Sequence, residues 1–255
     1  MLKTKALEVG YFSSKSYTTV SRNIDIALEP GEMAAVVGVN GIGKSTLLRT
    51  LAGVQDKLSG SIEINGREQQ EYNSRDWAME VSTVLTEPLT AKNLTVQQLI
   101  SLGRHPYTNW IGTLSRYDIE IIQQAMEQAG LNELKNKKCY ELSDGQLQKV
   151  MIARALAQDT RIIFLDEPTT HLDLYHKVQV LKILQRIAHS NGKIVLYTSH
   201  EIDLAIQLCD KILIMESGRN TFGKPQELIE QGCFTNLFPA DTIKFDQKSA
   251  SFKIR

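Results

Sequence analysis

The sequence predicts an α/β fold with a mainly parallel sheet, and three observations lead to this prediction. Uninterrupted apolar runs occupy residues 33–37, 162–165 and 194–197, a pattern typical of parallel strands that are buried on both faces. The first run leads through a glycine-rich loop into a stretch with apolar residues at helical spacing. Residues from about 88 to 158 change character and indicate helices, so a helical segment interrupts the alternation of strands and helices.

Composition and charge fit a globular chain and argue against several other kinds of protein. The 255 residues are 42% hydrophobic and 23% charged, which supports a sizeable core. The 29 basic residues balance the 29 acidic residues, so no overall basic field points to a nucleic-acid partner. No apolar run approaches the ~20 residues that cross a bilayer, and we expect no secretory signal in the first eight residues. Cys139, Cys209 and Cys233 have neither disulfide nor metal-site spacing, so we expect reduced thiols.

The first segment, to about residue 75, is expected to form short strands joined by turns. Residues 61–64 alternate between polar and apolar side chains, and Asn65 and Gly66 follow them. Because this dipeptide tolerates positive φ, the pattern predicts a β-hairpin.

Within this segment, residues 38–46, with the sequence GVNGIGKST, carry the clearest chemical signal. The pattern G-x-x-x-x-G-K-S is that of a loop that wraps the phosphates of a nucleoside triphosphate. Lys44 supplies a positive charge for the phosphates, and Ser45 supplies a hydroxyl for Mg²⁺. The helix that follows is expected to end at Gly53 and to present its N-terminus to the phosphates. A glycine turn without a ligand is the alternative. The residues expected to contact the triphosphate are Asn40, Gly41, Gly43, Lys44, Ser45 and Thr46.

Helix-start signals divide the segment from about 88 to 158. Thr95 and Gln98 have the spacing of a capping box, and we expect Gly103 to end the helix that they begin. Ser115 and Asp118 open a second helix with one apolar face. A third amphipathic helix follows Leu142-Ser143-Asp144-Gly145-Gln146, where Ser143 can serve only as an N-cap or can also offer an anion site.

The last third of the chain alternates strands and helices again. Asp166 and Glu167 follow a buried strand, where one carboxylate can hold Mg²⁺ and the other can orient or deprotonate water. An acidic pair that merely faces solvent is the alternative. The further strands and the helix expected here are residues 194–197, 211–215 and 178–187, and residues 242–245 with 251–254 are expected to form a closing hairpin.

In order and spacing, these motifs resemble the ATP-binding subunit of an ABC transporter, over nearly the whole chain. The resemblance implies a P-loop NTPase (RecA-like) core with an N-terminal antiparallel β subdomain and an inserted helical subdomain. Residues 1–255 would then be a single ABC ATPase domain. Its expected parts are the nucleotide-binding core with the β subdomain (1–86 and 159–230), the helical subdomain (87–158) and a C-terminal tail (231–255).

The resemblance also implies roles for particular residues, with ATP and Mg²⁺ as ligands. Glu167 corresponds to the catalytic glutamate and His200 to the switch histidine that contacts the γ-phosphate, beside Lys44. Ser45 and Asp166 would hold the metal. Tyr11 corresponds to the aromatic that stacks on adenine, although a core aromatic is the alternative for it. The family's signature and D-loop residues are Ser143, Gly145, Gln146 and Asp173.

For partners, the resemblance implies a second copy of the chain, paired head to tail so that each signature closes on the other's ATP. It also implies two transmembrane permease subunits, indirectly a substrate-binding protein, and a peripheral location on the cytoplasmic face of the inner or plasma membrane. Residues 103–107 (GRHPY), the His-Leu-Asp of the D-loop and the tail residues Phe245 and Phe252 resemble importers of iron chelates (siderophores), haem and cobalamin.

Two positions depart from the family pattern. Asp144 replaces a signature glycine, and we expect its carboxylate to point away from triphosphate because like charges repel. No glutamine follows residues 81–85, so Thr86 or Glu87 is expected to take the place of the residue that links Mg²⁺ to the permease. Two roles stay open for Tyr107 and Trp110. They can help to form a groove that receives a permease helix, or they can pack between helices of the helical segment.

Two other functions stay open at this stage. A soluble ABC-type ATPase of translation or DNA repair usually carries two cassettes or long coiled-coil insertions, and this sequence has neither. A P-loop kinase or small GTPase would leave the LSDGQ segment without a role, and the guanine-reading Asn-Lys-x-Asp motif is absent.

Overall fold

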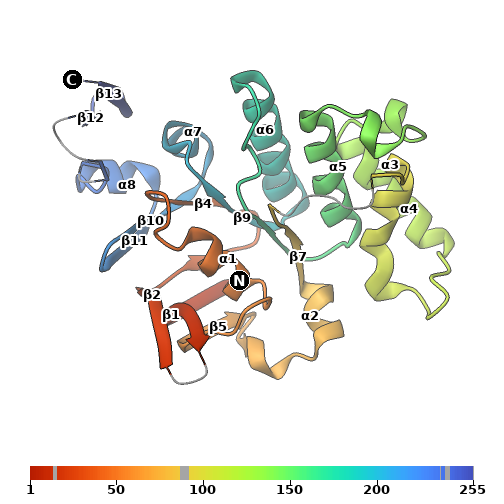
Figure 1. Cartoon of the computed structure of the whole chain (residues 1–255), viewed down its shortest axis with the longest axis horizontal. Coiled ribbons are helices and arrows are strands. Elements are labelled where there is room, and N and C mark those ends of the chain that lie inside the picture. The colour runs from red at the N-terminus through yellow and green to blue at the C-terminus, as the bar shows by residue number, and fades with distance from the viewer. Residues whose placement is uncertain (14–15, 87–91, 236, 239–241, 255) are drawn as a thin grey trace.

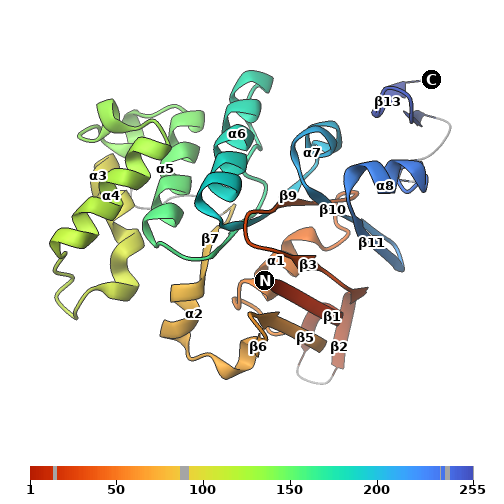
Figure 2. The same cartoon turned by 180° about the vertical axis from the view of Figure 1, so that it is seen from behind.

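The computed structural model describes residues 1–13, 16–86, 92–235, 237–238 and 242–254 (Figures 1 and 2). Within these residues, a six-stranded sheet has the order β11-β10-β4-β9-β8-β7. Neighbouring strands are parallel except for β10 and β11, which are antiparallel. The strands are β4 (Met33–Val37), β7 (Val81–Val84), β8 (Ile162–Leu165), β9 (Ile194–Ser199), β10 (Lys211–Glu216) and β11 (Arg219–Gly223).

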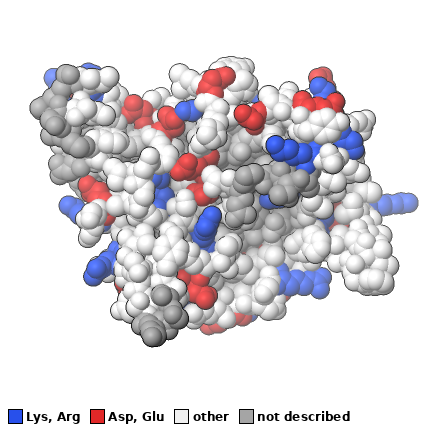
Figure 3. All heavy atoms as spheres, viewed as in Figure 1, with Lys and Arg blue, Asp and Glu red and all other residues white. Residues whose placement is uncertain are grey.

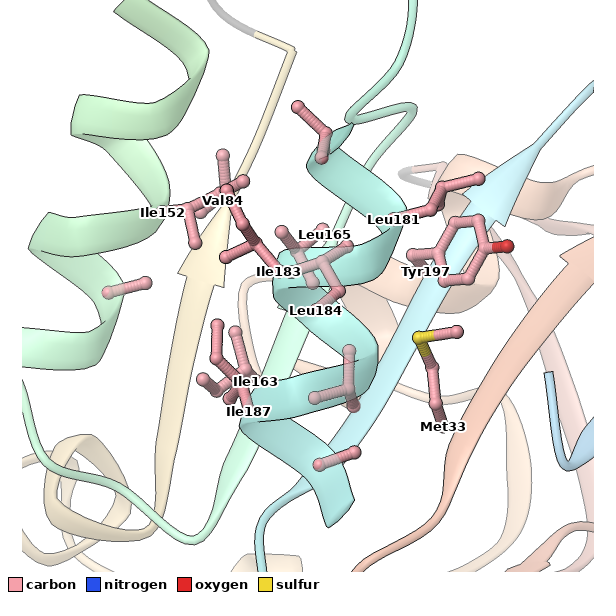
Figure 4. Close-up of a cluster of buried hydrophobic side chains, with 14 of the residues drawn as sticks. Met33, Val84, Ile152, Ile163, Leu165, Leu181, Ile183, Leu184, Ile187 and Tyr197 are labelled. Carbon is pink, nitrogen blue, oxygen red and sulfur yellow. The ribbon is translucent and has the colours of Figure 1, made fainter. Parts of the chain in front are cut away.

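The central strands are buried on both faces, which explains their uninterrupted apolar sequences. Successive side chains of a strand point to opposite faces, and the odd-numbered and even-numbered residues of β4 accordingly belong to different cores. Figure 4 shows the first core, where α6 (Leu174–Asn191) lies over Met33, Ile163 and Tyr197 of three neighbouring strands.

The second core lies between the large sheet, helix α1 (Lys44–Leu51) and an antiparallel sheet. Among the described residues, the antiparallel sheet has the order β2-β1-β5-β6, and β3 also pairs with β1. The predicted hairpin is confirmed, since Asn65 and Gly66 form its turn with φ values of 52° and 80°. The strands are β1 (Leu2–Ser13), β2 (Ser16–Ile24), β3 (Ala27–Leu28), β5 (Ser59–Ile64) and β6 (Arg67–Glu68).

A group of helices stands at one end of the large sheet, beside β7 (Figure 1). Its members are α3 (Val96–Ser101), α4 (Arg116–Gln128) and α5 (Asp144–Ala157), whereas α2 (Ser74–Glu80) leads directly into β7. The capping boxes that the sequence predicts for the first two helices are present, with Thr95 and Ser115 as N-caps. Ser143 caps α5 in the same way.

The prediction that Gly103 ends a helix is wrong. Helix α3 ends at Ser101, and Gly103 lies buried in a short 3-10 helix, Leu102–Tyr107, that continues from it. A Cβ atom on Gly103 would lie 2.3 Å from the carbonyl oxygen of Arg154 in α5. The glycine therefore permits close packing of two helical segments rather than a change of chain direction.

The C-terminal part closes the first core. Helices α7 (Ile202–Leu208) and α8 (Pro225–Glu230) are followed by the predicted hairpin, β12 (Ile243–Asp246) paired with β13 (Ser251–Ile254). The ring of Phe245 stacks on that of Phe234 at 5.1 Å and contacts that of Phe252 edge-on at 5.0 Å. The hairpin is thus attached by aromatic packing.

This topology positions the residues of the predicted site. Because β4, β9 and β8 are neighbours and parallel, their carboxyl ends lie side by side, and residues 38–43, 200 and 166–167 follow those ends. On the face shown in Figure 3, the described acidic and basic side chains are interspersed. None of the helices in the described ranges combines the length and hydropathy of a membrane span. The predicted fold class is confirmed.

Candidate active site

The glycine-rich loop joins β4 to α1 and wraps around the head of one lysine. Lys44 is buried, and its Nζ donates to the carbonyl oxygens of Gly38 at 2.9 Å and Val39 at 3.1 Å. Gly43 precedes the helix with φ of 109°, and a Cβ there would lie 2.3 Å from Val20 Cγ1. Only glycine fits this turn. The turn places the loop and the ammonium of Lys44 at the N-terminus of α1, a position that favours a bound anion.

The ammonium of Lys44 lies near two carboxylates and a histidine ring. Burial lowers its pKa, whereas the carboxylates of Glu167 and Asp166 oppose that change. The Nζ atom is 3.4 Å from Nδ1 of His200. The lysine is therefore near both carboxylates and the histidine that the sequence predicted to work with it.

Asp166 follows β8 and is surrounded by hydroxyl groups. Its Oδ1 accepts hydrogen bonds from Ser45 Oγ at 2.9 Å and Thr198 Oγ1 at 2.7 Å, and its Oδ2 accepts one from Thr86 Oγ1 at 3.1 Å. Oxygen donors of this kind suit Mg²⁺. Of the two residues considered for the position after β7, Thr86 contacts this carboxylate, and Glu87 lies outside the described residues.

Glu167 is held in a backbone conformation that is rare for this residue type. Its φ is 46°, and its N–H donates to Thr198 Oγ1 at 2.8 Å. Oε1 lies 2.6 Å from His200 Nε2, and Oε2 accepts a hydrogen bond from Thr170 Oγ1 at 3.0 Å. Burial raises the pKa of Glu167, but these hydrogen bonds and the charges of His200 and Lys44 outweigh it and keep the pKa below its usual value. The carboxylate is therefore ionised at neutral pH and can accept a proton from a bound water.

These groups surround a pocket of about 460 Å³. The hydroxyl of Tyr11 lies 2.9 Å from Thr46 Oγ1, and its ring, at the side of the pocket, is half exposed. A flat exposed ring next to a phosphate-binding loop is suited to stacking on a base. The residues that line the pocket are Tyr11, Val20, Asn40, Gly41, Gly43, Lys44, Ser45, Thr46, Glu167 and His200.

The LSDGQ segment does not line this pocket. Ser143, Gly145, Gln146 and Asp173 are not among the described residues that line this pocket. Ser143 and Gln146 form a capping box at the start of α5, and Asp173 caps α6 by accepting from the backbone N–H of His176. A single chain therefore does not bring the two predicted halves of a nucleotide site together.

A second cavity, of about 510 Å³, separates α5 from the carboxylates. Asp144 lines it together with Ser45, Thr86 and Asp166. The expected direction of the Asp144 carboxylate relative to a bound triphosphate stays a prediction.

Sequence reasoning missed two hydroxyl residues. Thr198 contacts both Asp166 and the backbone of Glu167, and Thr170 contacts the Glu167 side chain. Their only signal was closeness to a motif, since Thr198 comes two residues before His200 and Thr170 three residues after Glu167. A threonine at the end of a strand has many ordinary roles, so the contact could be found only from the fold.

Comparison with known proteins identifies the family. The model of the ABC transporter family matches residues 21–170, more than half of the chain. The chain belongs to the ABC transporter family. As members of this family bind and hydrolyse ATP, this ABC ATP-binding chain is an ATPase, and the pocket around Lys44 is its candidate nucleotide site.

Relatives match this ABC ATP-binding chain over nearly its full length. The achromobactin transport ATP-binding protein of Dickeya dadantii is 35% identical and covers 94% of this chain and 88% of its own length. The petrobactin import ATP-binding protein of Bacillus anthracis is 33% identical over 93% of this chain and 86% of its own length. The iron(3+)-hydroxamate import ATP-binding protein of Bacillus subtilis is 30% identical, with coverage of 95% and 86%.

Solved structures agree with the fold. CbiO1 of Clostridium perfringens, part of an ABC transporter complex, has a TM-score of 0.79 and 28% identity and covers 91% of both chains. A dimeric bacterial ABC cassette has a TM-score of 0.75, covers 88% of this ABC chain and 99% of its own, and is 24% identical. At that identity the second likeness concerns the fold alone.

Proposed function

We propose that this chain is the ATP-hydrolysing subunit of a membrane importer for iron–siderophore complexes or a related chelate such as haem or cobalamin. The observation that carries the enzymatic part is the meeting of Lys44, Asp166, Glu167 and His200 at the carboxyl ends of three neighbouring strands. The printed names of the relatives, which concern siderophore and cobalamin transport, support the class of cargo.

In the proposed reaction, the ammonium of Lys44 leaves the loop carbonyls and binds the phosphates of ATP. The N–H groups of the loop donate to the phosphate oxygens. Tyr11 stacks on adenine. Glu167 orients the attacking water and accepts its proton, while His200 contacts the γ-phosphate and keeps the carboxylate in place.

The residues around Asp166 fit a magnesium ion. Ser45 and Asp166 would hold it, since a hydroxyl and a carboxylate oxygen already lie 2.9 Å apart. No group of three or more His, Cys, Asp or Glu side chains within the described ranges could hold a metal, which agrees with an ion that takes much of its coordination from phosphates and water. When bound, Mg²⁺ neutralises charge on the phosphates.

Two copies of the chain are proposed to pair head to tail. Ser143, Gly145, Gln146 and Asp173 would then complete the site that holds the partner's ATP. None of these four residues lines the pocket of its own chain, and this supports the arrangement, because a lone chain would leave them without a ligand.

The assembly is proposed to include two permease subunits and, indirectly, a substrate-binding protein, with this chain peripheral at the cytoplasmic face of the membrane. Trp110, which is 94% exposed, stays a candidate for contact with the permease. Tyr107 instead packs under Arg104, whose guanidinium carbon lies 3.9 Å from the ring centroid.

The decisive experiment replaces the proposed base. Glu167→Gln is expected to reduce ATP hydrolysis at least about a hundredfold, because the amide cannot accept the proton. With ATP present, the variant is expected to elute as a stable dimer in size-exclusion chromatography with light scattering. Glu127→Gln, an exposed position on α4, serves as the control and should behave like the unchanged chain. Normal turnover by Glu167→Gln, or hydrolysis by a strict monomer, would contradict the proposal.

The cargo is tested separately. The chain is co-purified with the permease encoded by neighbouring reading frames and reconstituted in liposomes. Uptake of a ferric siderophore, haem and cobalamin is then compared with ATP inside. Retention of the chain by the permease and uptake of one chelate are expected. Stable association with ribosomes or DNA instead of a permease would favour a non-transport ATPase.

A further inference from the structure

The first turn of α6 contains a lysine that the proposed reaction does not use. Lys177 forms an ion pair with Glu201, the residue that directly follows His200 in the chain. We propose that Lys177 is a positioning residue for ATP hydrolysis, acting through Glu201 on the contact between His200 and Glu167. This inference rests on the proposed roles of His200 and Glu167.

Lys177 is well anchored on its own helix. Its backbone N–H donates to the carbonyl oxygen of Asp173, the N-cap of α6, at 2.9 Å. The side chain then crosses to the start of α7, where Nζ meets Glu201 Oε1. The two side chains are 21% and 38% exposed, so water only partly screens the pair.

The conformation of Glu201 indicates that the ion pair fixes its side chain. Glu201 is the N-cap residue of α7, a position where a carboxylate can accept hydrogen bonds from the first turn of the helix, but it makes no such bond. Its carboxylate is turned toward Lys177 instead. The helix loses one possible cap, and the linker between β9 and α7 gains a contact with α6.

That linker contains His200. Strand β9 ends at Ser199, whose Oγ accepts a hydrogen bond from the N–H of Glu201 at 2.9 Å. The carbonyl oxygen of His200 accepts one from the N–H of Ile202 at 3.1 Å. The ion pair adds an attachment outside this local turn. Lys177 thereby restrains Glu201, the neighbour of His200 in the chain, and through it the direction of the His200 ring.

The restraint matters because the contact that it supports is short and exposed. His200 Nε2 lies 2.6 Å from Glu167 Oε1, and the imidazole is 39% exposed. Lys177 itself lines neither the 460 Å³ pocket nor the 510 Å³ cavity, so it does not touch the reacting groups. Removing it should change how often the histidine and the carboxylate are correctly placed, without changing the nucleotide contacts.

The test compares kcat and KM for ATP in variants of the full chain. Lys177→Met and Glu201→Gln are each expected to lower kcat about threefold to fivefold, the size expected for one partly exposed ion pair, with KM for ATP unchanged. The double variant should be no worse than either single variant, because both remove the same contact. Lys177→Arg should retain most of the activity, since it keeps the charge.

The matched control is the ion pair of Lys211 with Glu32, whose side chains are 19% and 24% exposed and which lies at the opposite ends of the strands. Glu32→Gln should leave kcat unchanged. The inference is overturned if Lys177→Met has normal kcat, if the losses in the double variant are additive, or if KM rises in step with a lower melting temperature. Failure of the proposed function would look different, since Glu167→Gln would then turn over normally while the effect of Lys177→Met could still be measured.

Discussion

Hydroxyl side chains, rather than the charged groups alone, determine the geometry of the candidate active site. The hydroxyl of Thr198 donates to Asp166 and accepts from the N–H of Glu167, and so joins the proposed metal ligand to the proposed base. This contact also stabilises Glu167 at a φ of 46°, a conformation that an unsupported glutamate rarely adopts.

Replacing Thr198 by valine tests this role. The two side chains have nearly the same shape, so Thr198→Val removes the hydroxyl and leaves the buried carboxylate of Asp166 and the partly buried N–H of Glu167 with one partner fewer. We expect a loss of about 2 kcal/mol in the free energy of unfolding and a fall in kcat of about tenfold.

A second buried threonine provides the control. Thr160 is 1% exposed, and its hydroxyl bonds to Ser82 Oγ and to the Ile162 carbonyl at the opposite end of β8. Thr160→Val should lower stability by a similar amount while kcat stays normal. Stability is measured by urea unfolding, and kcat by steady-state hydrolysis of ATP. Equal kcat values in the two variants would argue against the role of Thr198.

The helical group depends on one buried ion pair. Arg104 is 2% exposed, lies 2.8 Å from Asp118 Oδ1, and donates to the carbonyl oxygen of Ala157. Asp118 is also the capping-box residue of α4, so a single carboxylate joins the 3-10 helix, α4 and, through Arg104, the end of α5. The sequence predicted Asp118 as a cap and did not predict the arginine beside it.

This pair makes the helical group sensitive to acid. Burial raises the pKa of Asp118, but hydrogen bonds from Ser115 and Arg104 and the charge of Arg104 outweigh it, and the pKa lies below its ordinary value. The ionised carboxylate therefore stabilises the fold above about pH 4, and the contribution is lost as the pH falls through the lowered pKa. Asp118→Asn should cost about 3 kcal/mol at pH 7, because it leaves the buried arginine charge without its anionic partner.

The measurement is urea unfolding of the unchanged chain and of the Asp118→Asn variant from pH 7 to pH 3. The difference between them should shrink as the pH falls below about 4, because the unfolded chain then takes up a proton at Asp118 more readily than the folded chain. Asp76 occupies the equivalent position at the exposed capping site of α2. Asp76→Asn should therefore change the free energy of unfolding only slightly over this pH range. A difference for Asp118→Asn that stays constant over this range would contradict the proposed charge effect.

In the whole molecule, the end of the chain is part of the main core rather than an appendage. Phe245 is 4% exposed and belongs to the same cluster as residues of α6 and β9, although it lies about 50 residues beyond that strand. The same cluster extends into the helical group, so one continuous core connects the tail, the sheet and α5. Figure 4 shows the part of it between the sheet, α6 and Ile152 of α5.

Phe245→Ala should therefore destabilise the whole chain and not only the tail. The expected loss is about 3 kcal/mol in the free energy of unfolding, from lost burial and the cavity that remains. Ile254→Ala, in the partner strand but 89% exposed, should change it by less than about 0.5 kcal/mol. Calorimetry would contradict the expectation if the Phe245 variant unfolded at the unchanged temperature, or in two separate transitions.

The sequence alone determined the elements whose causes are local. Apolar runs gave β4, β8 and β9, capping residues gave the starts of α3 and α4, and Asn65-Gly66 gave a hairpin, because each depends on residues within a few positions of one another. The phosphate loop and the pair Asp166-Glu167 were predicted for the same reason. Their meeting could be expected because parallel neighbouring strands bring their carboxyl ends together.

Only the tertiary structure decided what distant residues do for one another. The prediction for Gly103 was wrong because this glycine is required by its close approach to the carbonyl oxygen of Arg154. Arg154 lies 51 residues further along the chain, so no local sequence pattern indicates the contact. The same holds for Thr198 beneath Asp166 and for Lys177 beside Glu201. Side-chain contacts between elements depend on how those elements pack, and packing is a property of the folded chain as a whole.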